Sequence, residues 1–154
     1  MTLASRRPIV GVMGAGTEAW ADYAEPLGRH IAARGANLLT GGGPGTMTSV
    51  ARAFCETPGR RGVSIGILPS LPDAADGYVL RPGYPNAWIE VPIVTPLGIY
   101  AGGDDAALTR NHINVLTADA VVALPGSAGT HNEIRLARRY RRPLVLFGPA
   151  AAFG

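Results

Sequence analysis

Residues 8–16 read PIVGVMGAG, a short apolar run that passes directly into a glycine-rich loop. Such a run is typical of a buried parallel strand, and a helix-like segment follows it as far as Arg34, where Gly35 provides a stop. We expect this helix to start late or to kink, because Pro26 lies inside it. The stretch predicts a strand, a loop and a crossover helix, the repeating unit of a doubly wound α/β sheet.

The same alternation continues along the chain, with apolar runs separated by segments of helical periodicity. We expect strands at 37–40, 63–68, 88–94, 118–124 and 143–147, and helices at 46–54, 106–116 and 130–140. The stretch 70–87 is rich in Pro, Gly and Asp and predicts a long surface loop, and 95–105 is a second irregular stretch. Loops of such length tend to be functional. The predicted fold is a three-layer, Rossmann-like, doubly wound parallel sheet.

The length of 154 residues and the 47% hydrophobic content suit one core and are too small for two, so we expect 1–154 to form a single domain. The first apolar run is too short for a signal sequence or a membrane span. With Cys55 as the only cysteine, neither an intramolecular disulfide nor a Cys-rich metal cluster can form. We expect a cytoplasmic protein with no membrane association and no metal site. The end at 150–154 is abrupt, and we expect the closing helix to be missing or supplied by a partner.

All 14 basic residues are arginines, because the sequence contains no lysine. A pyridoxal-phosphate enzyme and a P-loop NTPase both need a lysine, so both classes are excluded. A cluster of arginines near the C-terminus could form a nucleic-acid-binding patch. Such patches usually include several aromatic residues, whereas this cluster contains only one. We prefer a solvated helix end, because cations favour helix C-termini. The cluster consists of Arg135, Arg138, Arg139, Arg141 and Arg142.

Three glycine-rich loops are predicted at the carboxyl ends of strands, where open parallel sheets bind their ligands. Backbone N–H groups at a helix start favour a phosphate, and glycine allows the backbone to come close. Each loop alone fits an ordinary turn, with Thr46 and Thr130 as plain N-caps, whereas the three together predict a phosphorylated ligand. The candidate residues are Gly14 and Gly16, then Gly41, Gly42, Gly43, Gly45, Thr46 and Met47, and finally Pro125, Gly126, Ser127, Gly129 and Thr130.

The first loop does not predict a nicotinamide cofactor. Ala19 stands where the dinucleotide-binding pattern has its third glycine, the middle spacing differs, and Glu18 would lie beside the pyrophosphate.

The last loop, LPGSAGTHNE at 124–133, resembles the proline-glycine-glycine-any-glycine-threonine-any-any-glutamate motif of the Lonely-guy family, whose members have been labelled lysine decarboxylases. Ser127 replaces the second glycine of that motif. Arg110 lies where the family has an arginine, and GGGPGTM at 41–47 resembles its other glycine-rich loop. The absence of lysine argues against a pyridoxal-phosphate-dependent lysine decarboxylase.

The neighbouring group of molybdenum cofactor carrier proteins resembles the chain more closely. The pair Arg110-Asn111, the segment GILP at 66–69 and the dipeptide at 85–86 carry this resemblance, while the stretch 99–108 is longer than in typical relatives. The resemblance implies a homo-oligomer that binds a phosphorylated pterin or nucleotide, with Asn111 near the ligand. The molybdenum cofactor and a nucleoside monophosphate are the two candidate ligands.

In the hydrolytic relatives, the residues that match Arg110 and Glu133 serve cleavage of the N-glycosidic bond of a nucleoside 5′-monophosphate. A carboxylate can orient water or stabilise the positive charge that develops on the ribose, and a guanidinium can hold a phosphate. The alternative is a structural ion pair between Arg110 and Glu133. We exclude His112 and His131 from the chemistry and expect Asp104 and Asp105 to be solvated, with a metal contact left open.

These observations leave three functions. The first is a carrier or binding protein for a phosphorylated ligand, the second is a phosphoribohydrolase, and the third is a nucleic-acid-binding module. We prefer the first, by a small margin over the second. Whether the protein is an enzyme stays open at this point.

Overall fold

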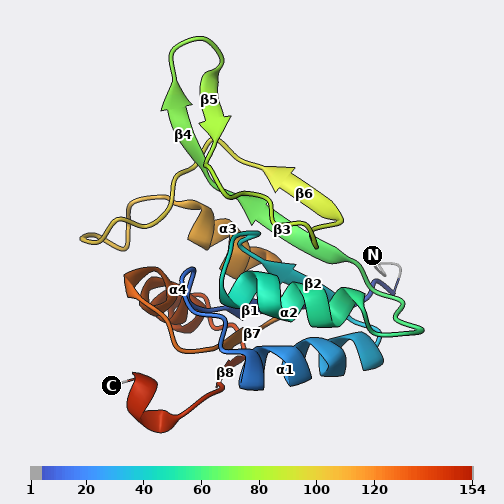
Figure 1. The fold of residues 1–154 in the computed structure, drawn as a ribbon. Helices are drawn as coiled ribbons and strands as arrows, with labels where there is room; N and C mark the ends of the chain where they lie inside the picture. Colours follow the sequence, from blue (N-terminus) through green and yellow to red (C-terminus); the bar gives the residue numbers. More distant parts are fainter. Residues whose placement is uncertain (1–4, 154) are drawn as a thin grey trace.

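A computed structural model describes residues 5–153, so residues 1–4 and 154 of the predicted domain lie outside the described part. Six parallel strands form the main sheet in the order β6-β3-β2-β1-β7-β8 (Figure 1). The predicted α/β fold is confirmed. The strands are β1 (Ile9–Met13), β2 (Asn37–Thr40), β3 (Ser64–Leu68), β6 (Val91–Val94), β7 (Ala120–Ala123) and β8 (Leu144–Leu146).

Helices cover both faces of the sheet and give three layers. They are α1 (Ala21–Ala33) and α2 (Thr46–Cys55) on one face, and α3 (Arg110–Thr117) and α4 (Ala128–Arg139) on the other. Successive strand residues point to opposite faces, so Val12 and Leu38 pack with α1 and α2, whereas Met13 and Leu39 pack against α3 and α4. This alternation gives the sheet one apolar core on each face.

The layer of α1 and α2 is tightly packed. Gly28 of α1 leaves no room for a side chain, because an added Cβ would meet the backbone of α2 at Val50 and Phe54. The helix α1 begins at Ala21, five residues before Pro26, so the proline lies inside the helix and does not mark its start.

The predicted surface loop 70–87 was wrong in part, because it contains a hairpin of β4 (Ser70–Asp73) and β5 (Gly77–Leu80) that projects from the body (Figure 1). Asp73 closes the turn, since its Oδ2 accepts from the N–H groups of Ala75 and Asp76. A two-stranded arm with most side chains exposed needs no apolar alternation, so the sequence did not show it.

Two helix starts differ from prediction. The helix expected from 106 begins at Arg110, because Asp104 accepts from the N–H groups of Ala106 and Ala107 and forms a separate turn. The helix expected from 130 begins at Ala128. Strand β7 begins two residues later than predicted and β6 three residues later, since the Asn86 side chain accepts from Trp88 N and holds a turn before β6.

The proposed N-caps were also wrong. Gly45 and Ser127 occupy the N-cap positions, so Thr46 and Thr130 lie inside α2 and α4. Gly45 has φ +66°, and an added Cβ would meet Ala15 O at 2.5 Å, so this cap requires glycine.

After β8 the chain forms a short 3-10 helix, η1 (Ala150–Phe153). Within residues 5–153, no helix has the length and apolar character that a membrane span requires.

Candidate functional site

A cavity of about 180 Å³ lies at the carboxyl ends of β1 and β2, where the first residues of α3 and α4 also reach it. This is the ligand-binding edge of an open parallel sheet. Its lining residues are Val12, Met13, Gly14, Gly16, Gly41, Met47, Tyr84, Ile99, Tyr100, Arg110, Asn111, Ser127, Gly129, Thr130 and Glu133.

The cavity brings together members of all three glycine-rich loops. Of the residues predicted from the sequence, those that line it are Gly14, Gly16, Gly41, Met47, Arg110, Asn111, Ser127, Gly129, Thr130 and Glu133. Those outside its lining are Gly42, Gly43, Gly45, Thr46, Pro125 and Gly126. In the second set, Thr46 and Pro125 hold the loops against one another.

Hydrogen bonds of Thr46 and Pro125 connect the three loops. Thr46 Oγ1 donates to Glu18 O at 2.9 Å, and Thr46 N donates to Ala15 O at 2.9 Å. Pro125 O accepts from Ala15 N at 3.3 Å. The first loop is therefore fixed to both of the others, and the N-terminal end of α2 already has a protein partner. The N-terminal end of α4 is the freer of the two, since its first paired N–H is that of His131.

Arg110 is the buried cation of the cavity, with 7% of its surface exposed. Its Nη1 donates to Gly41 O at 2.5 Å and to Ile67 O at 2.9 Å, and its Nε donates to Asn111 Oδ1 at 3.1 Å. The guanidinium also lies 5.8 Å from the ring centroid of Tyr84. These bonds fix the orientation of the side chain without neutralising its charge, so an anion in the cavity would meet a preoriented donor.

Gly41 makes this arrangement possible. A Cβ at this position would overlap the Arg110 guanidinium, with Cζ only 2.6 Å away. The glycine is required here by close approach of a side chain.

Glu133 lies in α4 with 6% of its surface exposed. Its Oε1 accepts from Asn114 Nδ2 at 2.9 Å. Burial raises the pKa of this carboxyl above its ordinary value, although the charge of Arg110 and the hydrogen bond from Asn114 act in the opposite direction. A buried carboxyl with a raised pKa in a cavity is typical of a functional group.

Arg110 and Glu133 share the cavity but are not an ion pair. Within residues 5–153, the ion pairs involve other residues, and the bonds of Arg110 go to two carbonyls and an amide. The structural ion pair considered from the sequence is therefore wrong, and both side chains line the cavity wall without a direct bond between them.

Sequence reasoning missed the aromatic part of the wall. Tyr84 comes from the segment after β5, and Ile99 and Tyr100 come from the irregular stretch before α3. The only signal was the presence of aromatic residues in two long irregular stretches. Val12 and Met13, also missed, are ordinary residues of β1 whose backbone ends at the cavity.

Other polar residues considered from the sequence have structural contacts. His112 is buried, and its Nδ1 accepts from Thr109 N at the start of α3. Asp105 is not simply solvated, because it pairs with Arg135. In the arginine cluster, Arg142 Nη2 donates to Leu116 O at 2.7 Å. Among the described residues, no group of three or more His, Cys, Asp and Glu could hold a metal ion.

A three-layer parallel sheet with a glycine-lined cavity at the carboxyl ends of its strands defines a Rossmann-like protein. The sequence model of the SLOG cluster4 family matches residues 7–153, and the chain belongs to this family.

Solved structures of relatives agree with this assignment. The molybdenum cofactor binding protein of the phototrophic bacterium Rippkaea orientalis is 35% identical with a TM-score of 0.69, over 92% of this chain and 76% of that one. The Moco carrier protein of Chlamydomonas reinhardtii is 34% identical with a TM-score of 0.69, over 96% and 80% of the two chains. The predicted resemblance to this group is confirmed. No curated protein sequence matches the chain at a significant level.

Proposed function

We propose that the chain is a binding protein for a phosphorylated, nucleotide-like ligand, of the kind that carries a pterin cofactor or a nucleotide. The observation that carries this proposal is the preoriented guanidinium of Arg110 in the wall of a cavity that the first residues of α4 also line. A helix N-terminus and an arginine together suit a phosphate. Support also comes from the names of the two relatives, which describe proteins that bind or carry the molybdenum cofactor.

The residues of the wall fit a ligand with a flat heterocycle at one end. Tyr84 and Tyr100 place aromatic rings at the cavity wall. The lining contains no His, Cys or Asp, so a metal carried by the ligand would meet few protein donors. The chain would therefore recognise the organic part and the phosphate of the molybdenum cofactor, taken as cargo.

A second candidate is a phosphoribohydrolase, and Glu133 favours it. Its second carboxyl oxygen has no side-chain partner within residues 5–153, and the residue lines the cavity together with Arg110. In such a reaction water adds to C1′ of the ribose, the C–N bond breaks, and the base leaves with a proton. Glu133 would orient the water or stabilise the charge on the ribose, and Arg110 would hold the phosphate.

Turnover separates the two candidates. Purified protein is incubated with AMP, GMP, CMP and UMP, and free base is measured by chromatography, with Glu133→Gln as the control variant. A binding protein leaves every nucleotide intact while its thermal midpoint rises with one of them. Release of a base that is lost in Glu133→Gln would replace the first candidate with the second.

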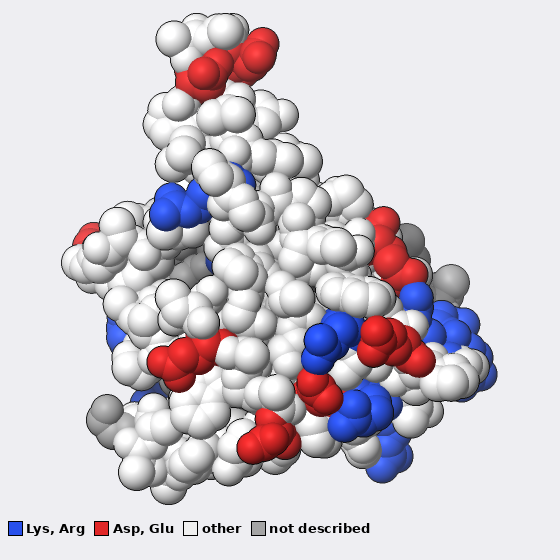
Figure 2. Space-filling model, in the orientation of Figure 1, with Lys and Arg blue, Asp and Glu red and all other residues white. Residues whose placement is uncertain are grey.

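We also propose that the chain forms a homo-oligomer in the cytoplasm. Apolar side chains on β6 and the hairpin are exposed, among them Val79, Ile93 and Val94. Figure 2 shows that charged side chains gather over the side of α1 and α2, while the region of β6 carries few of them. Exposed apolar surface of this kind is typical of protein contacts. A single-chain mass in light scattering would contradict the proposal.

Nucleic-acid binding is the least supported alternative. Arg135 and Arg142 of the arginine cluster already bond to Asp105 and to Leu116 O. A salt-dependent affinity for RNA or DNA that AMP does not compete away would revive it.

A further inference from the structure

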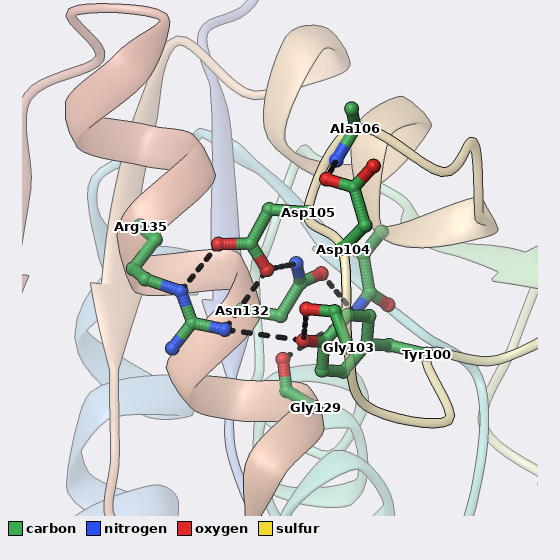
Figure 3. A network of polar contacts seen from close by, with 9 residues as sticks. Tyr100, Gly103, Asp104, Asp105, Ala106, Gly129, Asn132 and Arg135 are labelled. Atoms are coloured by element: carbon green, nitrogen blue, oxygen red, sulfur yellow. Dashed lines mark hydrogen bonds and ion pairs between the residues drawn. The ribbon is translucent and has the colours of Figure 1, made fainter.

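A directed chain of hydrogen bonds connects the cavity to the protein surface. Arg110 Nε donates to Asn111 Oδ1 at 3.1 Å, and Asn111 Nδ2 donates to Asn132 Oδ1 at 2.9 Å. Asn132 Nδ2 then donates to Asp105 Oδ1 at 2.8 Å. Asp105 also accepts from Arg135 Nε at 2.5 Å and from Arg135 Nη2 at 2.9 Å. We call this chain of hydrogen bonds the relay. Figure 3 shows its outer half, with Asp105 between Asn132 and Arg135.

Every bond of the relay runs toward the carboxylate. Each asparagine accepts with its oxygen and donates with its nitrogen, so neither amide can turn over without losing two bonds. Asn132 is fully buried and Asn111 nearly so, which makes such a loss costly. The carboxylate of Asp105 therefore sets the direction of the relay, and the relay in turn holds the Nε edge of Arg110.

The same carboxylate holds the segment 99–108, which we call the rim loop. Its ends are fixed by backbone bonds, because Ser70 N donates to Leu97 O and Arg110 N donates to Gly98 O. Between these points, the hydrogen bonds from the rim loop to other described residues go only to Asn132 and Arg135 of α4. The rim loop carries Ile99 and Tyr100 of the cavity wall. Asp105 therefore orients the Arg110 guanidinium through the relay and also holds the rim loop that carries Tyr100.

We infer that Asp105, Asn132 and Arg135 are positioning residues for the ligand, through which α4 fixes the rim loop and the guanidinium of Arg110 at once. The expected effect on affinity rests on the proposed binding function. The expected effects on the rim loop and on Arg110 do not, because they can be measured without a ligand. The Asp105–Arg135 pair lies largely at the surface, with side-chain exposures of 31% and 48%, so it contributes little to global stability. Its contribution is to local order and to affinity.

The test uses Arg135→Ala in the full chain, with Arg6→Ala as the matched control. Arg6 makes the same kind of two-bond contact with the surface carboxylate of Asp119, at side-chain exposures of 57% and 33%, and it lies outside the cavity lining. Without ligand, hydrogen–deuterium exchange should rise about threefold or more in the rim loop of Arg135→Ala and stay unchanged there in Arg6→Ala. The NMR signal of Arg110 Nε–H, assigned by its loss in Arg110→Lys, should shift in Arg135→Ala alone.

Affinity gives the third readout. The dissociation constant of the best-bound nucleotide among AMP, GMP, CMP and UMP should rise about tenfold in Arg135→Ala, as for other residues that support a binding group, with partial recovery in Arg135→Lys. Unchanged exchange or an unchanged Arg110 signal would overturn the inference, and so would unchanged affinity in a wild-type protein that binds. If the wild-type protein binds no nucleotide, the proposed function fails, and the first two readouts still decide the inference.

Discussion

The two helical layers of the sheet bury very different side chains. The layer of α1 and α2 buries mostly apolar groups such as Ile31, Val50 and Phe54, with Thr46 and Ser49 as exceptions near the start of α2. The layer of α3 and α4 buries a polar set that consists of Arg110, Asn111, His112, Asn114, Thr130, Asn132 and Glu133. Buried polar groups cost stability unless they are bonded. The layer of α1 and α2 is therefore the more apolar of the two, and the layer of α3 and α4 combines its apolar contacts with the sheet and a polar site.

The polar layer is not fully satisfied. Asn114 donates to Glu133, yet its own Oδ1 is buried without a hydrogen-bond partner, and the same holds for Thr109 Oγ1. Such atoms near a cavity are typical of a functional site, where order is kept at a cost in stability.

The largest effect on stability is expected in the apolar layer. Phe54 is fully buried between α2 and the sheet, and Phe54→Ala should lower the free energy of unfolding by about 3–5 kcal/mol, because it leaves a cavity. Urea denaturation measures the change. The nucleotide affinity of the molecules that remain folded should be unaltered. A loss below about 1 kcal/mol would contradict the role given to this layer.

A smaller loss, combined with a functional defect, is expected from Gly41→Ala. The added methyl would displace the guanidinium of Arg110 from its carbonyl acceptors, at a cost of about 1–3 kcal/mol for the unmatched buried groups. Gly129→Ala is the control, because open space surrounds its Cβ and α4 should gain helix propensity. Urea denaturation of both variants checks the prediction, and equal stability would show that Arg110 can move freely.

The polar layer should respond to Glu133→Gln with a gain in stability. The folded-state pKa of Glu133 is raised, so the ionised form is disfavoured in the folded protein, and its cost appears as the pH rises through the folded-state pKa. The amide keeps the bond from Asn114 and removes that cost, which should give a gain on the order of 1 kcal/mol at pH 7.5. The gain should vanish toward pH 4, where the side chain at position 133 is neutral in the folded wild-type protein as well as in the variant. Thermal unfolding at several pH values measures it, and a loss of stability at pH 7.5 would contradict the prediction.

The smallest effect should come from the surface pair of Arg6 and Asp119, which belongs to neither layer. Arg6→Ala should lower the free energy of unfolding only slightly at pH 7, because solvent screens this exposed pair. The hydrogen bond from Arg6 lowers the pKa of Asp119, so this contribution is present above the unfolded-state pKa and disappears as the pH falls through the folded-state value. An effect as large as that of Phe54→Ala would remove the contrast between core and surface.

Sequence patterns predicted the apolar layer and the strands well, because buried parallel strands and short glycine loops leave local signals. Arg110 and Glu133 were also within reach, since a motif carries them. The relay could not be predicted, because Asp105 and Asn132 meet only when the rim loop folds over α4. The N-caps were misplaced because Gly45 and Ser127 take positions that threonine would also suit.

The central claim is that the start of α4 and Arg110 receive a phosphate, and Ser127 offers the most direct test. It is exposed and occupies the N-cap position of α4, and both Asp and Asn are good N-cap residues, so Ser127→Asp and Ser127→Asn should fold equally well. We predict that calorimetric titration with AMP, GMP, CMP and UMP finds a ligand for the wild-type protein and for Ser127→Asn. The added negative charge in Ser127→Asp should weaken its binding about tenfold or more. Equal affinity in Ser127→Asp, or no binding by the folded wild-type protein, would contradict the claim.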